Sequence, residues 1–443
     1  MSSIIKVAKF GGSSLADASQ FRKVISIVKS DDSIKYVVPS APGKRFSADT
    51  KVTDMLLNCY DKVLSGGDFD EDLMNIKKRY DSIIADLGVE LSLDEEFVRI
   101  GYAMRSRAGR DYVASRGEYL CGIVLAKCLG FDFVHASGIV RFKNDGSLDV
   151  ELTDASTAAS LAKCKYAVVP GFYGSMPNDT IKTFSRGGSD ITGAIVARAV
   201  KADVYENWTD VSGFLMADPR IVKEPKSISV ITYRELRELS YMGATVLHED
   251  SIFPVSAAGI PINIRNTNRP EDKGTMIVES VPGDSESDTV ITGIAGRNNF
   301  AVVDIEKDQM HGDVGFMARA FDLFRSHKIS IEHVPTGIDN MSVVVLDDAN
   351  FASGEEGLLK ELDAKLCPDY LKVDRDLALI AVVGRAMKSK PGTAAKVFSA
   401  VAKNNISIRM IDQGSSELNI IIGVDRVNFE TAINAIYNEF TEA

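Results

Sequence analysis

The chain has 443 residues, of which 45% are hydrophobic and 26% are charged, and its formal net charge is −11. This length exceeds one ordinary core and predicts two or three domains, and the composition is typical of a soluble globular protein. The acidic balance argues against a protein that binds the phosphate backbone of nucleic acid. Five cysteines lie scattered without a Cys-x-x-Cys pair, and no apolar run approaches membrane-spanning length. We therefore expect a cytoplasmic protein with reduced thiols and no membrane partner.

Strand-like and helix-like patterns alternate over the N-terminal half of the chain. Phe21, Val24, Ile25 and Val28, for example, have the i, i+3, i+4, i+7 spacing of an amphipathic helix. The expected strands are residues 4–9, 36–39, 131–135, 166–170 and 203–206, and the expected helices are 17–30, 51–65, a charged helical region over 68–108, and 190–201. This alternation predicts an α/β fold with a mainly parallel sheet flanked by helices on both faces.

Two glycine-rich loops follow apolar runs and precede helical patterns. The first is Lys9-Phe-Gly-Gly-Ser-Ser14 and the second is Ser185-Arg-Gly-Gly-Ser-Asp190. A strand that ends in such a loop and opens a helix points backbone N–H groups and the helix dipole at one place, which favours phosphate. Since each loop also carries fixed charges, the pair indicates phosphoryl transfer, where catalysis is mostly positioning and charge neutralisation.

The C-terminal part contains an internal repeat. Polar, turn-rich segments at 270–274 and 282–288 indicate a surface excursion or linker before it. Four pairs of similar segments follow, each pair separated by 77 residues: 300–303 and 377–380, 315–321 and 392–398, 329–331 and 406–408, and 341–344 and 418–421. Each unit reads strand, helix, strand, strand, helix, which predicts a small antiparallel sheet with helices on one face. A duplicated structural module without a ligand is the alternative interpretation.

Four ordered segments carry a resemblance to a known family. They are Lys9–Ser14, Ser115-Arg-Gly-Glu118, Arg186–Asp190 and Trp208-Thr-Asp-Val211. In order and approximate spacing they resemble the signature segments of aspartate kinases, which belong to the amino-acid kinase superfamily. The repeat resembles the tandem ACT domains of the same enzymes. The resemblance covers nearly the whole chain and implies an amino-acid kinase domain over 1–290 and ferredoxin-like ACT modules over 300–376 and 377–443, the second of which can share strands with 291–305.

The resemblance also implies a reaction, the ATP-dependent phosphorylation of the β-carboxylate of L-aspartate to 4-phospho-L-aspartate. This is the first step of lysine, threonine and methionine biosynthesis. Mg²⁺ is expected with ATP, held mostly by phosphates and water, and neither a protein metal site nor a tightly bound cofactor is expected. Because no second catalytic domain follows the repeats, the chain is expected to be monofunctional. A non-catalytic amino-acid sensor is the alternative, and intact Lys9, Glu118, Arg186 and Asp190 argue against it.

The transfer gathers negative charge, so cations must line its path. Lys9 is the expected catalytic cation, and Asp190 is expected to orient it by charge, with a helix cap as the alternative role of Asp190. Arg186 suits a carboxylate and Glu118 suits the ammonium group of aspartate. The residues expected to bind aspartate are Ser40, Thr53, Glu118, Phe172, Arg186 and Ser189. Those expected to bind ATP are Lys9, Gly11, Gly12, Ser13, Thr209, Asp210, Phe214, Asp218 and Arg220.

Three features depart from the family pattern. Thr245 stands where many members have a lysine that contacts ATP, which leaves the nucleotide one cation short. Leu215 stands where a nucleotide-facing aromatic residue is common, with Phe214 adjacent. The stretch 42–52 before Thr53 is also long.

An amino-acid effector is expected at the first repeat. Gly312 and Gly315 leave a helix start open to an effector carboxylate, and Asp313 and Glu332 suit cationic groups, which favours lysine. The alternative is that these acids merely solvate the edge of the module. The expected effector-binding residues are Asp313, Phe316, Met317, Ser330, Ile331 and Glu332. Two chains are expected to pair through these modules in a homodimer or tetramer, since a shared sheet buries exposed edges.

Overall fold

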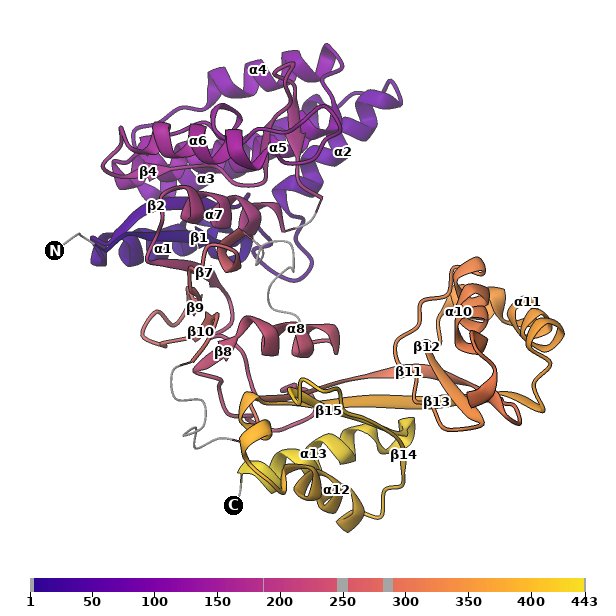
Figure 1. Ribbon diagram of the computed structural model, residues 1–443. Coiled ribbons are helices and arrows are strands. Elements are labelled where there is room, and N and C mark those ends of the chain that lie inside the picture. Colours follow the sequence, from indigo (N-terminus) through magenta and orange to yellow (C-terminus); the bar gives the residue numbers. More distant parts are fainter. Residues whose placement is uncertain (1–3, 186, 245–253, 282–289, 442–443) are drawn as a thin grey trace. The chain divides into compact units, whose positions relative to one another are not determined.

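The computed structural model describes residues 4–185, 187–244, 254–281 and 290–441, and Figure 1 colours the chain along its sequence. The chain forms two compact units. The first unit consists of Met1–Phe214, Ser227–Tyr233 and Val246–Ser280, and the second of Leu215–Lys226, Arg234–Thr245 and Val281–Ala443. The domain boundaries expected from the sequence stay a prediction.

An eight-stranded sheet forms the centre of the first unit, in the order β3-β4-β2-β1-β7-β9-β10-β8 (Figure 1). Neighbouring strands are parallel except for β9 and β10, which are antiparallel. The mainly parallel sheet that the sequence predicts is therefore confirmed. The strands are β1 (Lys6–Phe10), β2 (Ile34–Pro39), β3 (Asp132–Phe133), β4 (Ala167–Val168), β7 (Val204–Thr209), β8 (Val230–Thr232), β9 (Ile262–Asn266) and β10 (Thr275–Val278); β5 (Tyr173–Ser175) and β6 (Ile181–Thr183) form a separate hairpin.

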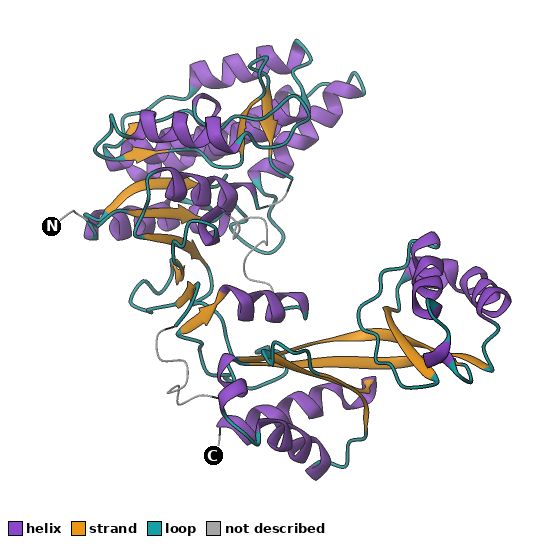
Figure 2. Cartoon of the chain, in the orientation of Figure 1, coloured by secondary structure: helices purple, strands orange, loops and turns teal. Residues whose placement is uncertain are grey.

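Helices cover both faces of this sheet (Figure 2). Because side chains alternate along a strand, Ala8 and Phe10 of β1 face one side and Val7 and Lys9 face the other. The first side shares a buried core with α1 to α5. On the other side, α7 packs on β1, β2 and β7, and α6 packs on α7. These helices are α1 (Ala18–Ser30), α2 (Val52–Leu64), α3 (Asp70–Leu87), α4 (Asp94–Arg105), α5 (Arg110–Leu129), α6 (Val150–Leu161) and α7 (Gly188–Ala199).

Local signals explain where several helices begin and end. The Asp17 side chain accepts a hydrogen bond from the Gln20 backbone N–H at 3.0 Å and so caps α1. The charged region expected over 68–108 is two helices, because the backbone turns left-handed at Gly88, with φ 67°, and ends α3. Helix α5 is buried on nearly all sides, which places its Ser115–Glu118 segment inside the unit.

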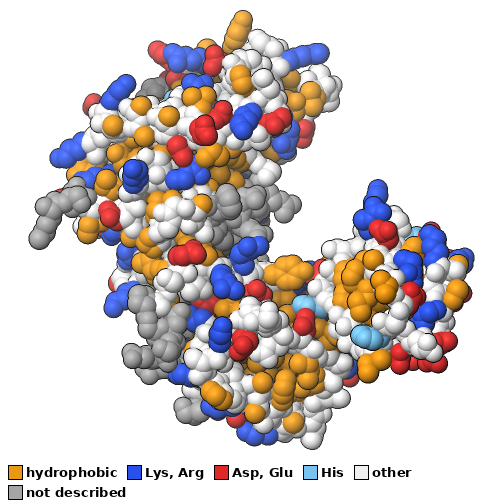
Figure 3. Space-filling model, in the orientation of Figure 1, with side chains coloured by type: hydrophobic (Ala, Val, Ile, Leu, Met, Phe, Trp, Pro, Cys, Tyr) orange, Lys and Arg blue, Asp and Glu red, His pale blue; other side chains and the backbone are white. Residues whose placement is uncertain are grey.

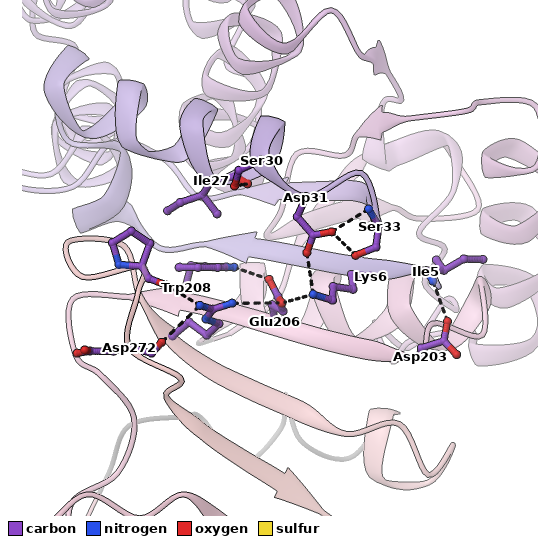
Figure 4. Close-up of polar contacts among 12 residues, drawn as sticks. Ile5, Lys6, Ile27, Ser30, Asp31, Ser33, Asp203, Glu206, Trp208 and Asp272 are labelled. Atoms are coloured by element: carbon purple, nitrogen blue, oxygen red, sulfur yellow. Dashed lines mark hydrogen bonds and ion pairs between the residues drawn. The ribbon is translucent and has the colours of Figure 1, made fainter. Parts of the chain in front are cut away.

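Figure 4 shows a buried polar cluster that anchors β7. Glu206 pairs with Ala8 of β1 and Asn207 pairs with Lys9, so the cluster lies on the face of the sheet opposite to Lys9. The Glu206 carboxylate, 2% exposed, accepts a hydrogen bond from the Trp208 indole at 2.9 Å and pairs with the Lys6 ammonium at 3.2 Å. Arg265 of β9 lies 3.8 Å from the same carboxylate and stacks over the Trp208 ring at 4.5 Å. The cluster therefore ties β1, β7 and β9 together, which holds the residues on their other face in a fixed register.

The second unit is built on one antiparallel five-stranded sheet, in the order β12-β11-β13-β15-β14. Its strands are β11 (Gly293–Glu306), β12 (Asn340–Leu346), β13 (Tyr370–Val383), β14 (Ile408–Asp412) and β15 (Asn419–Asp425), and its helices are α10 (Phe316–Ser326), α11 (Ala349–Leu366), α12 (Thr393–Lys403) and α13 (Phe429–Thr441). Helix α8 (Tyr233–Tyr241) follows β8 directly and belongs, from Arg234 on, to this unit.

The internal repeat is visible in this sheet, since α12 begins and ends 77 residues after α10. The two modules share their long strands. The second half of β11 pairs with the first half of β13 beside β12, and the first half of β11 pairs with the second half of β13 beside β15. The strand expected near 329–331 is not formed in the first repeat, where only an isolated bridge joins His333 and Val344. The two α+β modules are thus present in the fold.

The surface and the helices agree with the charge and hydropathy of the sequence. Figure 3 shows acidic and basic side chains interspersed over the visible face, so charge on that face is not gathered into a basic patch. Within the described part of the chain, no helix combines the length and hydropathy that a membrane span needs.

Candidate active site

A pocket of about 560 Å³ lies where β1, β2 and β7 end. The carboxyl ends of parallel strands meet at one edge of a sheet, which is where α/β proteins generally bind ligands. The pocket is lined by six residues that the sequence predicts to bind substrates, Gly12, Ser13, Ser40, Thr53, Glu118 and Asp210, and also by Ala41, Pro42, Gly43, Lys44, Phe46, Ser47 and Lys51.

The loops after β1 and β2 touch along their backbones. The Gly43 N–H donates to the Gly12 carbonyl at 2.8 Å. A Cβ on Gly43 would lie 2.5 Å from the Gly12 carbonyl carbon, and one on Gly12 would lie 2.9 Å from the Ala41 carbonyl oxygen. Neither position has room for a larger residue, so this close approach fixes two edges of the pocket against each other.

Glu118 presents a buried carboxylate to the pocket from helix α5. The helix packs so closely that a Cβ on Gly117 would lie 2.8 Å from the Ala41 side chain. The Glu118 residue is 6% exposed, and burial raises the pKa of its carboxyl group to about 8, against the opposing effects of the Ala41 backbone and the Arg116 charge. Among the described residues its Oε2 atom has no hydrogen-bond partner. Since buried polar atoms are normally satisfied, this oxygen is suited to a cationic ligand group.

An ion pair between Lys9 of strand β1 and Asp190 of helix α7 joins the sheet to this helix. The Lys9 ammonium lies 2.6 Å from Asp190 Oδ1, and the Asn207 side-chain amide donates to the same oxygen at 2.7 Å. Lys9 is 7% exposed and its ammonium lies beside Gly11, where a Cβ would be 3.6 Å away, rather than in the pocket lining. Asp190 thus holds a buried cation next to the first glycine-rich loop.

The start of α7 is shaped by a strained neighbour. Phe172 has φ 81°, which is rare for a bulky side chain, and its N–H donates to the Thr192 hydroxyl at 3.0 Å. A Cβ on Gly188 would lie 2.5 Å from the Phe172 ring, and Ser189 is 7% exposed against Gly171. Phe172 and Ser189 therefore lie at the N-terminal turn of α7. Arg186 lies outside the described residues.

The residues expected around the nucleotide fall in two parts of the chain. Asp210 is exposed in the pocket lining, and Thr209 donates a hydrogen bond to it at 3.2 Å. Phe214 is 3% exposed and packs in the first unit, and its N–H donates to the Thr275 hydroxyl at 2.8 Å. Asp218 and Arg220 belong to the second unit, as does Leu215, and the two charged side chains pair with each other at 2.5 Å. Thr245 and His248 lie outside the described residues.

Comparison with known proteins decides the family. Residues 5–266 match the amino acid kinase family, and residues 380–440 match an ACT domain. Aspartokinase 3 of Bacillus subtilis (strain 168) is 37% identical over 450 residues, which cover 98% of this chain and 98% of that protein. The chain belongs to the aspartokinase family.

Solved structures of family members agree with the fold. The aspartate kinase of Clostridium acetobutylicum is 46% identical, with a TM-score of 0.91 over 99% of this chain and 100% of that one. Aspartokinase III of E. coli in complex with aspartate and ADP is 25% identical, with a TM-score of 0.71 over 98% of this chain and 99% of that one. The aspartate-kinase resemblance read from the four motifs is thereby confirmed, as are the amino-acid kinase fold and the ACT region.

The residues expected to bind an effector lie in the first repeat of the ACT region. Phe316 is buried in the core of that module, whereas Met317 and Ser330 are exposed and Ile331 is half-buried. The two acids already have partners. Asp313 accepts from Arg319 at 2.6 Å, which lowers the pKa of its carboxyl group, and Glu332 accepts a short hydrogen bond from the Tyr241 hydroxyl on α8.

Sequence reasoning missed three kinds of residue near the pocket. Asn207 shares Asp190 with Lys9 and gives no local signal, because only strand pairing brings it there. Lys44 and Lys51 lie in the stretch noted only for its length. Arg79 is buried and donates a hydrogen bond to the backbone of that stretch. The sequence does indicate its burial, because Arg79 lies on the same helix face as Ile76, Tyr80 and Ile83.

Within the described residues, no group of three or more His, Cys, Asp and Glu side chains lies close enough together to hold a metal ion.

Proposed function

We propose that this aspartokinase transfers the γ-phosphoryl group of ATP to the β-carboxylate of L-aspartate, giving 4-phospho-L-aspartate and ADP. A carboxylate oxygen attacks the γ-phosphorus, and the bond from that phosphorus to the oxygen bridging the β- and γ-phosphates breaks. The observation that carries the proposal is the unsatisfied, buried Glu118 carboxyl group in the pocket that Gly12 also lines, in a chain of which 98% aligns with an aspartokinase.

In this proposal Glu118 takes the ammonium group of aspartate. An ammonium group beside a buried carboxylate favours the ionised form, so binding offsets the burial that raises the Glu118 pKa. Arg186 takes a carboxylate of aspartate, and the hydroxyls of Ser40 and Thr53 and the side chains of Phe172 and Ser189 complete the amino-acid site. Ser40 and Thr53 line the same pocket as Glu118, which supports their assignment.

Lys9 neutralises the charge that develops between the two substrates. Its ammonium is already oriented by Asp190 and lies next to the loop whose Gly11, Gly12 and Ser13 approach the nucleotide phosphates. Positioned charge of this kind stabilises phosphoryl transfer without reorganisation at the moment of reaction. Asp190 is therefore proposed as a residue that orients Lys9, and not as a base, because the attacking carboxylate carries no proton to remove.

The remaining nucleotide contacts are proposed to come from Thr209, Asp210, Phe214, Asp218 and Arg220. Asp210 accepts a hydrogen bond from the ribose or the adenine amino group, and Arg220 contacts phosphate once it leaves Asp218. Mg²⁺ binds with ATP and neutralises phosphate oxygens, held mostly by those phosphates and by water.

A coupled assay of ADP formation tests the activity. We expect ADP to form when ATP, Mg²⁺ and L-aspartate are all present, and not when L-aspartate is omitted or replaced by L-glutamate. ADP formation at the same rate without aspartate would identify an ATPase and contradict the proposal. The sensor alternative predicts no ADP under any of these conditions.

The ACT region is proposed to give feedback inhibition by lysine. The ammonium groups of lysine suit Asp313 and Glu332, and its carboxylate suits the start of α10 after Gly315, which has φ 88°. Lysine has to displace Arg319 and Tyr241 from these acids, so binding changes contacts inside the ACT region. The coupling to the kinase domain is then expected to be ~1–3 kcal/mol. Inhibition by threonine alone, with no effect of lysine, would contradict this effector.

Two further proposals concern assembly and location. Chains pair through their ACT regions in a homodimer or tetramer, and the protein works in the cytoplasm. Analytical ultracentrifugation of the full chain and of a variant with altered ACT edge residues tests the pairing, and a monomer at micromolar concentration would contradict it.

A further inference from the structure

The loop between β2 and α2 brings two lysines into the pocket. Lys44 and Lys51 both line it, beside Ser40, Thr53 and Glu118. The Lys44 ammonium donates only to the Ser47 carbonyl, at 3.3 Å, and Lys51 is exposed directly before α2. Among the described residues neither lysine forms an ion pair, in contrast to Lys9, whose charge is compensated by Asp190 at 2.6 Å.

The same loop is held rigidly by a buried arginine from another helix. Arg79 of α3, 6% exposed, donates to the Thr50 carbonyl at 2.8 Å, to the Ala16 carbonyl at 3.2 Å and, in a short bond, to the Gly43 carbonyl. It thus joins Ala16, two residues beyond the first glycine-rich segment, to Gly43 and Thr50, which directly precede Lys44 and Lys51. The Arg79 guanidinium reaches these carbonyls from two nitrogens in one plane, whereas a lysine would have to reach them from a single nitrogen.

The carboxylate of Asp49 pairs with the two arginines of this region and forms no ion pair with either lysine. Its carboxylate accepts from the Arg45 backbone at 2.9 Å and from the Arg45 side chain at 2.8 Å, and it lies 3.6 Å from Arg79. These contacts hold the pKa of Asp49 well below its usual range. The one carboxylate of the loop is therefore committed to two guanidinium groups.

The part of the pocket formed by this loop has two ammonium groups without an ion-pair partner among the described residues, which suits an anion, whereas Glu118 and Asp210 line the same pocket with acidic groups. The loop backbone is fixed by Arg79 and by the Gly12–Gly43 contact, so the position from which each lysine extends is set before a ligand arrives. Because the backbone is already fixed, only the lysine side chains have to be ordered when a ligand binds. The two substrates of the proposed reaction are both anions.

We propose that Lys44 and Lys51 form an oxyanion-binding subsite, which takes a carboxylate of the amino acid or the terminal phosphate of the nucleotide, and that Arg79 is the positioning residue that holds this subsite. The inference rests on the proposed function only in its choice of substrates. The geometry of the lysines and of Arg79 is independent of it.

Lys44→Met, Lys51→Met and the double variant test the subsite directly. The matched control is Lys78→Met, which removes an exposed lysine beside Arg79 that does not line the pocket. Charge-assisted contacts of this strength predict that the double variant raises the KM of one substrate about tenfold or more. A higher KM for aspartate would show that the lysines bind a carboxylate of the amino acid. A higher KM for ATP would show that they bind the terminal phosphate of the nucleotide. Wild-type KM values for both substrates in the double variant would overturn the proposal.

Direct binding separates this inference from the proposed function. Calorimetric titration with a non-hydrolysable ATP analogue that keeps the γ-phosphate and, separately, with L-aspartate needs no turnover. If the wild type makes no ADP in the presence of aspartate, the proposed function fails, and weaker binding of either probe by the double variant still supports the subsite. Unchanged binding of both probes overturns the subsite whatever the activity.

Arg79→Lys tests the positioning role. We expect it to raise the KM of the same substrate as the lysine variants, and to have no further effect on that KM when Lys44 and Lys51 are already Met. A merely structural arginine would lower stability and impair both substrates equally in either background. If Arg79→Lys does not fold, Asp49→Asn loosens the same contacts and is expected to give the same selective KM change; equal changes for both substrates in that variant would overturn the positioning role.

Discussion

Because the proposed partner of the aspartate ammonium group is the buried carboxyl group of Glu118, aspartate binding is expected to depend on pH. Its pKa is about 8 in the ligand-free protein, so only about 10% of the molecules carry the ionised carboxylate at pH 7. If the ammonium group of aspartate binds only the ionised form, the dissociation constant at pH 7 is about tenfold higher than its limit at high pH. Between pH 7 and pH 8.5 the ionised fraction rises about eightfold, and the affinity for aspartate is expected to rise with it.

The assay is calorimetric titration of L-aspartate between pH 6.5 and 8.5, in two buffers with different ionisation enthalpies. Near pH 7 we expect almost one proton to be released for each aspartate bound. Glu118→Gln is expected to bind aspartate weakly and without pH dependence, whereas the exposed Glu95→Gln behaves like the wild type. A wild-type affinity that stays constant over this range, or tight binding by Glu118→Gln, would refute the assignment.

The same group affects stability with a definite sign. The folded-state pKa is raised, so the folded protein binds more protons than the unfolded chain between about pH 4.5 and pH 8. The free energy of unfolding is therefore expected to fall as the pH rises through this window, by roughly 4–5 kcal/mol at most from this group. In Glu118→Gln that part of the slope disappears.

Three other variants probe separate parts of the account. Lys9→Ala is expected to lower kcat by orders of magnitude while the fold is kept, and a near wild-type kcat in the folded variant would remove Lys9 from the reaction. Gly43→Ala forces a Cβ to 2.5 Å from Gly12 and is expected to reduce activity strongly, whereas Gly109→Ala meets nothing within 4 Å; equal activities would show that the two loops do not need to touch. Tyr241→Phe frees Glu332, so inhibition by lysine should need less lysine, and an unchanged inhibition constant would contradict competition between Tyr241 and the effector.

The sequence predicts well those features that local pattern encodes. The parallel sheet follows from the alternation of strand and helix patterns along the chain, and the period of 77 residues places α10 and α12 correctly relative to each other. Gly12 and Ser40 line one pocket because they follow the ends of β1 and β2, which are neighbouring parallel strands, by two residues and by one residue. In each case the predicted feature lies within a few residues of the sequence pattern that indicates it.

Features that depend on contacts between residues far apart in the chain are harder to predict from the sequence. Asn207 reaches Asp190 only because β7 lies beside β1, and the sharing of β11 and β13 between the two modules depends on sheet register. Arg79 could have been found, because a charged residue on an apolar helix face must have a buried partner. Its partners could not have been found in this way, because they are backbone carbonyls of residues far away in the chain.

The central claim is that the chain forms an acyl phosphate on aspartate, and trapping that product tests it most directly. Hydroxylamine converts an acyl phosphate to a hydroxamate, which mass spectrometry identifies and assigns to the α- or β-carboxyl group. We expect β-aspartyl hydroxamate to form in proportion to ADP, only when ATP, Mg²⁺, L-aspartate and the protein are all present, and to be absent with Lys9→Ala. ADP formation without any aspartyl hydroxamate, or hydroxamate at the α-carboxyl group, would contradict the account.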